Sequence, residues 1–352
     1  MSTLSNAPRQ PPCPSGPASR RKAPSKQALR PLGSILEAVG ETPLIHLRRR
    51  FAGARARVLA KIEGLNPGGS SKDRPALRIV EEALARGELK PGSVVVESSS
   101  GNMGIGLAQA CRYHGLRLIC VVDPKASRTN IAILRAYGAE VDAIREPDPE
   151  TGEYLQARLH RVQEILAADP AAFWPNQYGN RHNAREHYET TMEEILRVVP
   201  APDYLFIPTS TCGTLAGCAQ KVRELGLSTR VVAVDAVGSL IFDHQRCQRL
   251  LPGLGASLRP PLCPIELVDE VSLMSDLDAV RGCRRLLADE AIFAGASSGA
   301  VVSAIERALP EIAPGSEVVG ILPDRGERYL DTVFSDSWTR EHFGDAAFEN
   351  GF

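Results

Sequence analysis

The sequence predicts an α/β fold in which open, twisted, mostly parallel sheets are flanked by helices. Two patterns predict it. Short, mainly apolar runs of strand length recur along the chain, and such runs are typical of strands covered on both faces, as in parallel sheets. These runs alternate with helical segments, and repeated strand–helix–strand units imply right-handed crossovers. The predicted strands occupy residues 56–62, 93–98, 117–123, 139–144, 203–209, 231–236 and 318–324.

Helices are predicted between the first four strands, at residues 75–87, 103–115 and 128–138. A chain of 352 residues suits one large α/β unit or two intimate domains. We expect two α/β domains with soft edges. The N-terminal domain spans 66–180, the C-terminal domain combines 34–65 with 181–335, and 336–352 form a C-terminal extension.

Residues 1–33 differ in character from the rest of the chain. They are rich in Pro, Ser and basic residues and have few large apolar side chains. Because so little apolar surface cannot offset the entropy of ordering, we expect a disordered tail. The basic cluster Arg20-Arg21-Lys22 could be a targeting or tethering signal, although a solvated tail is the simpler interpretation.

The charge balance excludes several classes of partner. Lys and Arg total 41 and Asp and Glu total 42, so the formal net charge is −1. No global field then draws the chain to nucleic acid or to membranes. No apolar run approaches the roughly 20 residues of a membrane helix, and the N-terminus has no apolar signal core. We therefore expect a cytoplasmic protein that binds neither nucleic acid nor a membrane.

The cysteines and histidines do not form a metal or disulfide pattern. The eight cysteines contain no C-x-x-C pair, and several, such as Cys120, lie in apolar surroundings. We interpret them as mostly buried free thiols. The histidines are scattered, and His182 and His187 are five residues apart, the wrong spacing for one helical face. No metal site is expected.

Three Ser- and Gly-rich turns follow strand-like runs or lead into helices, at 98–104, 209–217 and 294–305. Ligands of open α/β sheets bind beyond the carboxyl ends of strands, and a helix start there favours an anion. Each turn alone could also be an ordinary helix cap. The second turn lacks the lysine of a Walker loop, so a triphosphate is not expected.

The segment "NPGGSSKDR", residues 66–74, places Lys72 after a Gly/Ser turn at the start of a helical pattern. Taken with the three turns, this lysine suits a small phosphorylated cofactor and an amino-acid carboxylate. Pyridoxal 5′-phosphate fits, because its aldehyde needs a lysine for a Schiff base. Desolvation would lower the pKa of Lys72 and make it a usable base.

From about Ile35 to Tyr329 the chain resembles the fold-type II pyridoxal-phosphate enzymes of the cysteine synthase and cystathionine β-synthase superfamily. The motifs are "VGETPLIHL", "NPGGSSKDR", "SSGNMG", "STCGT", "GASSG" and "RGERYL", in the family's order. The resemblance implies a homodimer, a cofactor that lies between the two domains, and β-replacement through an aminoacrylate. It makes Lys72 the Schiff-base lysine and catalytic base, with Asn102 on the cofactor's ring hydroxyl and Ser297 on its ring nitrogen.

The same resemblance assigns two loops. The cofactor's phosphate would be held by the helix start at Ser210, Thr211, Cys212, Gly213 and Thr214. The carboxylate of the first substrate would be held by Ser98, Ser99, Ser100, Gly101 and Gln177.

Further motifs resemble a narrower subfamily, the N-(2-amino-2-carboxyethyl)-L-glutamate synthases of siderophore and antibiotic diaminopropionate pathways. They include "GEYLQAR", "NQYGN" and "LPDRGERYLDTVFSD". These enzymes join O-phospho-L-serine to the amino group of L-glutamate and release phosphate. Such a nucleophile brings two carboxylates, and we expect Arg158 to bind one of them, with Tyr178 and Ser210 as further second-substrate residues.

Several alternatives stay open on sequence grounds. Arg158 could point to solvent, as helix arginines usually do, and Tyr178 could be core packing. The nearest rival activities are cysteine synthase, cystathionine β-synthase and O-phosphoserine sulfhydrylase, and a non-catalytic binding protein is a more distant one. The group that receives the leaving phosphate is not assigned, with Arg74, Lys125 and Arg128 as basic residues in plausible loops. Arg185 and His187 could line the entrance but are expected on the surface.

Overall fold

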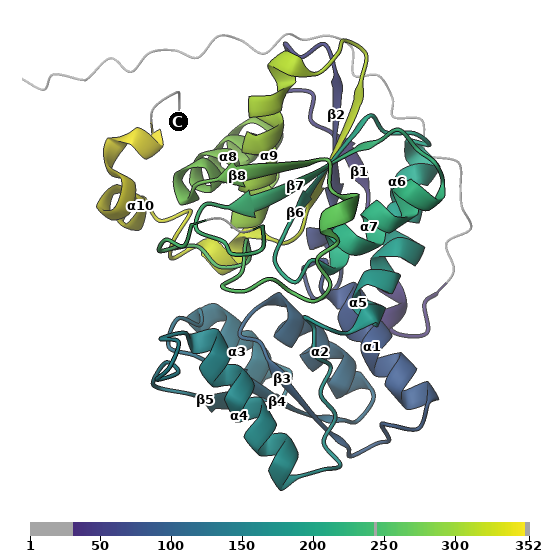
Figure 1. Cartoon of the computed structure of the whole chain (residues 1–352), viewed down its shortest axis with the longest axis vertical. Coiled ribbons are helices and arrows are strands. Elements are labelled where there is room, and N and C mark those ends of the chain that lie inside the picture. Colours follow the sequence, from purple (N-terminus) through teal and green to yellow (C-terminus); the bar gives the residue numbers. More distant parts are fainter. Residues whose placement is uncertain (1–30, 243–244, 349–352) are drawn as a thin grey trace, which may run out of the picture. The chain divides into compact units, whose positions relative to one another are not determined.

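The computed structural model describes residues 31–242 and 245–348, and their strands form two separate sheets (Figure 1). The larger sheet has six strands in the order β1-β2-β9-β6-β7-β8, and the smaller has the order β3-β4-β5. Every pair is parallel except β1 with β2. The strands are β1 Leu44–His46, β2 Arg57–Ile62, β3 Val94–Ser98, β4 Arg117–Val122, β5 Glu140–Ala143, β6 Tyr204–Pro208, β7 Arg230–Ala236, β8 Glu270–Met274 and β9 Glu317–Leu322.

Helices cover both sheets. The α-helices are α1 Asp73–Ala85, α2 Asn102–Tyr113, α3 Arg128–Ala136, α4 Tyr154–Ala168, α5 Arg181–Glu186, α6 Met192–Val198, α7 Gly213–Glu224, α8 Asp276–Glu290, α9 Ala296–Ala308 and α10 Asp336–Phe343. A π-helix, η3 His187–Thr191, joins α5 to α6 without a break.

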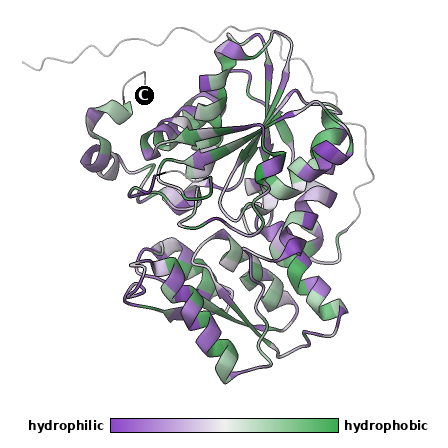
Figure 2. Cartoon of the chain, viewed as in Figure 1, coloured by the Kyte–Doolittle hydropathy of each residue, from purple (hydrophilic) through white to green (hydrophobic). Residues whose placement is uncertain are grey.

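The apolar runs form strands because both of their faces are buried. In β7, Val232 and Val234 pack into a core with α8 and α9, whereas Val231 and Ala233 pack into another with α6 and α7. Figure 2 shows the hydrophobic colour along these strands. The smaller sheet repeats the arrangement: Val95 faces the core of α1 and α2, and its neighbour Val96 faces α4.

The predicted α/β fold is confirmed, and each of the seven predicted strands is present within a residue or two of its expected position. The strands β1 and β8 were not predicted. β1 has three residues, and β8 reads "EVSLM" with only Met274 buried. Such short or half-exposed segments lack the apolar run that marks most of the other strands.

The two sheets fall within the residue ranges predicted for the two domains. β3–β5 lie within 66–180, and the other strands lie within 34–65 and 181–335. Residues 34–352 group as one compact unit, so the division into two domains stays a prediction. In the predicted C-terminal extension, Trp338 and Phe343 pack against the core of the larger sheet.

The tail is predicted at 1–33, and its residues 1–30 lie outside the described part of the chain. Among the described residues, no helix combines the length and the apolar character needed to cross a membrane.

Candidate active site

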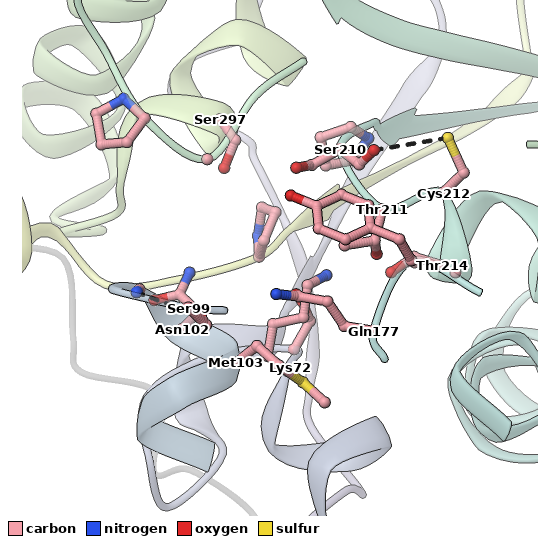
Figure 3. Close-up of a pocket in the computed structure, with 18 of the residues that line it drawn as sticks. Lys72, Ser99, Asn102, Met103, Gln177, Ser210, Thr211, Cys212, Thr214 and Ser297 are labelled. Atoms are coloured by element: carbon pink, nitrogen blue, oxygen red, sulfur yellow. Dashed lines mark hydrogen bonds between the residues drawn. The ribbon is translucent and has the colours of Figure 1, made fainter. Parts of the chain in front are cut away.

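One cavity of about 190 Å³ brings together every residue that the sequence assigned to cofactor or substrate. Its walls come from the carboxyl ends of β3, β6 and β9 and from the starts of α1, α2, α7 and α9, as expected for an open α/β sheet. Figure 3 shows Ser297 on one side of the cavity, Thr211 and Thr214 on the other, and Lys72 between them. Ser71, Met103, Pro208, Pro252, Gly253, Ile321 and Pro323 also line it.

Lys72 stands at the N-cap of α1 with its amine in this cavity. Asp73 holds the preceding turn by accepting hydrogen bonds from Gly68 N and Ser70 Oγ, and Ser71 N donates to Pro323 O at 2.8 Å. Within the described part of the chain, Lys72 Nζ has no hydrogen-bond or ion-pair partner. Burial lowers the pKa of Lys72 below its usual 10.5, while the charge of Asp324 opposes the shift. The chain therefore holds a reactive amine inside the protein.

The loop from Thr209 to Cys212 ends β6 and starts α7. Cys212 is left-handed, with φ of +63°, and no side chain caps the helix. The first N–H groups of α7 are therefore left for an anion in the cavity. Gly213 is required here, because a Cβ at this position would meet the side chain of Asn183 at 2.0 Å.

The loop Ser98–Gly101 leads from β3 into α2, whose N-cap residue, Gly101, has no side chain to cap the helix. Ser99 Oγ accepts a hydrogen bond from Gly104 N at 3.0 Å, and Gln177 Nε2 donates to Ser98 O at 3.2 Å. Asn102 Nδ2 donates to Asp324 Oδ2 at 2.9 Å. The loop is thus fixed from both sides and presents hydroxyl and N–H groups suited to a carboxylate.

Arg158 points to the cavity rather than to solvent. Its side chain is 14% exposed, and its Nε lies 3.1 Å from Asp123 Oδ2. Tyr178 lies nearby: burial raises the pKa of its phenol, and the Arg158 charge opposes that shift. The cavity therefore has a guanidinium and a phenol on the side of Gln177.

A sequence profile described as "Pyridoxal-phosphate dependent enzyme" matches residues 35–324. The chain belongs to this family. It is 49% identical over 306 residues to the "N-(2-amino-2-carboxyethyl)-L-glutamate synthase" of Ralstonia nicotianae, covering 87% of this chain and 90% of the relative.

Solved structures of similar enzymes share the fold. An O-ureido-L-serine synthase is 32% identical with a TM-score of 0.80, covering 92% of this chain and 98% of its own. A hydrogen sulfide-producing enzyme from Fusobacterium nucleatum is 31% identical with a TM-score of 0.79, covering 85% and 100%.

The cavity fits pyridoxal 5′-phosphate on its own geometry. The uncapped start of α7 suits the phosphate group, and the unpaired amine of Lys72 suits the aldehyde. Ser297 is 3% exposed, and its hydroxyl has no hydrogen-bond partner among the described residues, so it can meet the ring nitrogen. The cavity therefore offers one group each for the phosphate, the aldehyde and the ring nitrogen.

Three buried polar residues behind the cavity were missed by the sequence analysis. Asn183 Nδ2 donates to Gln177 O and to Thr211 Oγ1, which ties the substrate side to the phosphate side. Asp324 also accepts a hydrogen bond from Tyr329, and burial raises its pKa. Glu97 is 1% exposed and accepts hydrogen bonds from Ser98 N, Gln177 N and Trp174 Nε1. Asp324 follows β9 and Glu97 lies within β3. No local sequence pattern marked either of them, or Asn183, as a residue of the site.

Two expectations about basic residues are corrected. His187 is fully buried, not on the surface, because η3 turns it toward α7. Arg74 is 1% exposed and pairs with Glu63 and Glu194, so it is not available to the leaving phosphate. Arg185 is exposed, as expected, and pairs with Glu189.

Glu97 should make the enzyme less stable as pH rises. Burial raises its pKa from 4.5 to about 7, so its contribution is complete below pH 4.5 and is lost as pH rises through 7. This shift corresponds to about 3 kcal/mol. We expect Glu97→Gln to flatten the fall in unfolding free energy between pH 5 and 8, measured by denaturant titration. The exposed control Glu150→Gln should keep the wild-type slope, and an equal slope in both variants contradicts this assignment.

Proposed function

We propose that this enzyme joins O-phospho-L-serine to the amino group of L-glutamate. The products would be N-(2-amino-2-carboxyethyl)-L-glutamate and phosphate, for the biosynthesis of 2,3-diaminopropionate in a siderophore or antibiotic pathway. The relative from Ralstonia nicotianae, with 49% identity over most of both chains, supports this activity. We also propose that it works in the cytoplasm as a homodimer, as its resemblance to the family implies.

The observation that carries the proposal is the placement of Arg158. A sulfide nucleophile has no carboxylate and needs no such partner, whereas glutamate has two. Arg158 offers a planar guanidinium at the cavity wall, and among the described residues it has one ion-pair contact, to Asp123. Tyr178 and Ser210 line the same cavity and can donate to the second carboxylate.

The roles of the other groups follow from their positions. Pyridoxal 5′-phosphate, when bound, supplies the electron sink that lets a serine derivative lose its β-substituent. The N–H groups of the Ser98–Gly101 loop, with Gln177, orient the donor's carboxylate. Lys72 Nζ would then take the proton from the donor's Cα, and burial, which lowers its pKa, makes the amine a better base.

A second cavity, of about 330 Å³, offers a place for the leaving phosphate. Lys125, Arg246 and Arg249 line it, with Glu153 as a single carboxylate that pairs with Arg246. Residues 247–249 of its wall come shortly before Pro252 and Gly253, which line the first cavity. Arg249 Nη1 donates to Leu254 O, and its other N–H groups have no partner among the described residues.

We expect Arg249→Gln to raise the KM for O-phospho-L-serine about tenfold, because one charge-assisted contact to the phosphate is lost. The KM for glutamate should not change. Steady-state kinetics with each substrate varied will measure both, with the exposed Arg230→Gln as a control. An unchanged KM for O-phospho-L-serine would show that Arg249 does not bind the phosphate group.

We expect Arg158→Ala to lower kcat/KM for glutamate about 100-fold, since a bidentate carboxylate contact is lost. Phosphate release from O-phospho-L-serine in a single turnover without glutamate should stay near the wild-type rate. Arg161→Ala is the matched control, because Arg161 lies on the same helix, is 41% exposed and pairs with Asp142 and Glu164. Unchanged glutamate kinetics in Arg158→Ala reject the assignment.

The decisive experiment gives the holoenzyme O-phospho-L-serine with glutamate and sulfide in competition and identifies the products by mass spectrometry. We expect the glutamate adduct with little cysteine. Cysteine as the main product would instead make the protein an O-phosphoserine sulfhydrylase. A preference for O-acetyl-L-serine as donor would make it a cysteine synthase of the ordinary kind.

A further inference from the structure

A buried histidine lies directly behind the phosphate loop. His187 is 0% exposed and opens the π-helix η3, a rare element often found at functional sites. Helix α7 approaches it closely through Gly217, where a Cβ would lie 2.1 Å from Ala184 O and 2.9 Å from His187 Cβ. No larger residue would let α7 approach this closely, so the contact between His187 and the phosphate loop is built into the packing.

Both ring nitrogens of His187 are hydrogen-bonded to threonine hydroxyls. Nε2 lies 3.1 Å from Thr214 Oγ1, and Nδ1 lies 2.9 Å from Thr191 Oγ1. Neither hydroxyl has another partner among the described residues. Thr191 is 0% exposed, whereas Thr214 is 7% exposed and lines the active-site cavity (Figure 3). The chain of contacts therefore runs from the protein interior to the edge of the cavity.

The imidazole is neutral in this setting. Burial lowers the pKa of His187 well below 6.5, and the charges of Lys72 and Arg74 lower it further, against the opposing charge of Glu194. A neutral imidazole has one donor and one acceptor, so its two nitrogens must play opposite roles.

The cofactor's phosphate decides which nitrogen carries the proton. Ionised phosphate oxygens mainly accept hydrogen bonds, so the Thr214 hydroxyl has to donate to them. Thr214 Oγ1 must then accept from His187, which places the proton on Nε2. Nδ1 is left as the acceptor for the hydroxyl of Thr191, whose only described partner it is.

We propose that His187 is a positioning residue that holds the Thr214 hydroxyl hydrogen toward the cofactor's phosphate. It acts through Thr214 and touches neither cofactor nor substrate. The inference rests on the cofactor and on Thr214 as a phosphate ligand, but not on which donor or acceptor the enzyme uses.

The wild-type holoenzyme gives the first test without any substrate. In protein labelled with ¹⁵N-histidine, we expect the NMR signals of the His187 ring to show a protonated Nε2 and an unprotonated Nδ1. The signals that disappear in the His187→Gln variant identify this ring. A proton on Nδ1 instead overturns the proposal. Because no substrate is present, this result is independent of the competition experiment.

A double-mutant cycle gives the second test. We expect His187→Leu and Thr214→Val each to raise the dissociation constant of pyridoxal 5′-phosphate about tenfold and to shift the ³¹P resonance of the bound cofactor. The double variant should bind pyridoxal 5′-phosphate no more weakly than either single variant does. His187→Gln, which can still donate to Thr214, should restore most of the affinity and the wild-type ³¹P shift.

Multiplicative effects in the double variant, of about 100-fold, would show that His187 does not act through Thr214. An unchanged ³¹P shift in His187→Leu would likewise show that the histidine only fills space behind the loop and does not orient Thr214. If His187→Leu does not fold, His187→Gln and the tautomer measurement still decide the proposal.

Discussion

Lys72→Ala should lower kcat/KM by at least about 10⁴-fold, because it removes the amine that we propose both to bond the cofactor and to take the Cα proton. No other lysine lines the cavity among the described residues. The cavity shape should survive, since the backbone of Lys72 is held by Ser70 and the turn by Asp73. Steady-state kinetics measure the loss, and mass spectrometry after borohydride reduction of the wild-type holoenzyme should find the cofactor on the peptide containing Lys72.

The exposed Lys90 provides the control for this prediction. Lys90→Ala should keep wild-type kinetics and the same site of cofactor attachment. If Lys72→Ala retained a tenth of the wild-type kcat/KM, or if reduction trapped the cofactor on another lysine, the assignment of Lys72 would be wrong. Either result would leave the fold and the family unchanged.

The sequence predicted those parts of the fold that a local pattern records. The runs that became β6, β7 and β9 are buried on both faces, so most of their residues are apolar and the pattern was plain. β8 has one buried residue in five and gave no such signal. Its place at the edge of the sheet is decided by pairing with β7.

The same distinction separates the predicted from the missed site residues. The cavity loops carry their own signal, because a Ser/Gly turn between a strand and a helix needs small or hydroxyl residues. Glu97, Asn183 and His187 meet the cavity loops only after distant segments pack together, as Asn183 does by binding Gln177 O and Thr211 Oγ1. A lone buried Glu, Asn or His looks like any other in the sequence.

A buried ion cluster connects the helix of Lys72 to the larger sheet. Arg74 on α1 lies 2.7 Å from Glu63 and 2.6 Å from Glu194 of α6, and Lys61 of β2 lies 2.5 Å from Glu194. All four side chains are at most 5% exposed. Burial alone would raise the pKa of Glu63, but the charge of Arg74 and its hydrogen bonds hold it below the usual value. Two cations and two anions together leave no net buried charge.

Arg74→Met should lower the free energy of unfolding by about 3 to 5 kcal/mol, because it keeps most of the volume but leaves two buried carboxylates with one lysine. Denaturant unfolding measures the change. The same substitution at Arg117, whose pair with Glu140 is more than half exposed, should change the free energy of unfolding far less.

Combining Arg74→Met with Glu194→Gln tests whether the cluster stabilises the protein through its charges or through its packing. The double substitution removes one charge of each sign, so the charges of the remaining Lys61 and Glu63 still balance. The double variant should therefore lose less unfolding free energy than the sum of the losses in the two single variants. Strict additivity would mean that the cluster stabilises the protein by packing alone. Because Arg74 lies two residues after Lys72, we also expect Arg74→Met to lower kcat at temperatures where the protein stays folded. The cluster then has two effects: it stabilises the chain, and it fixes the start of α1 so that the lysine stays in the cavity.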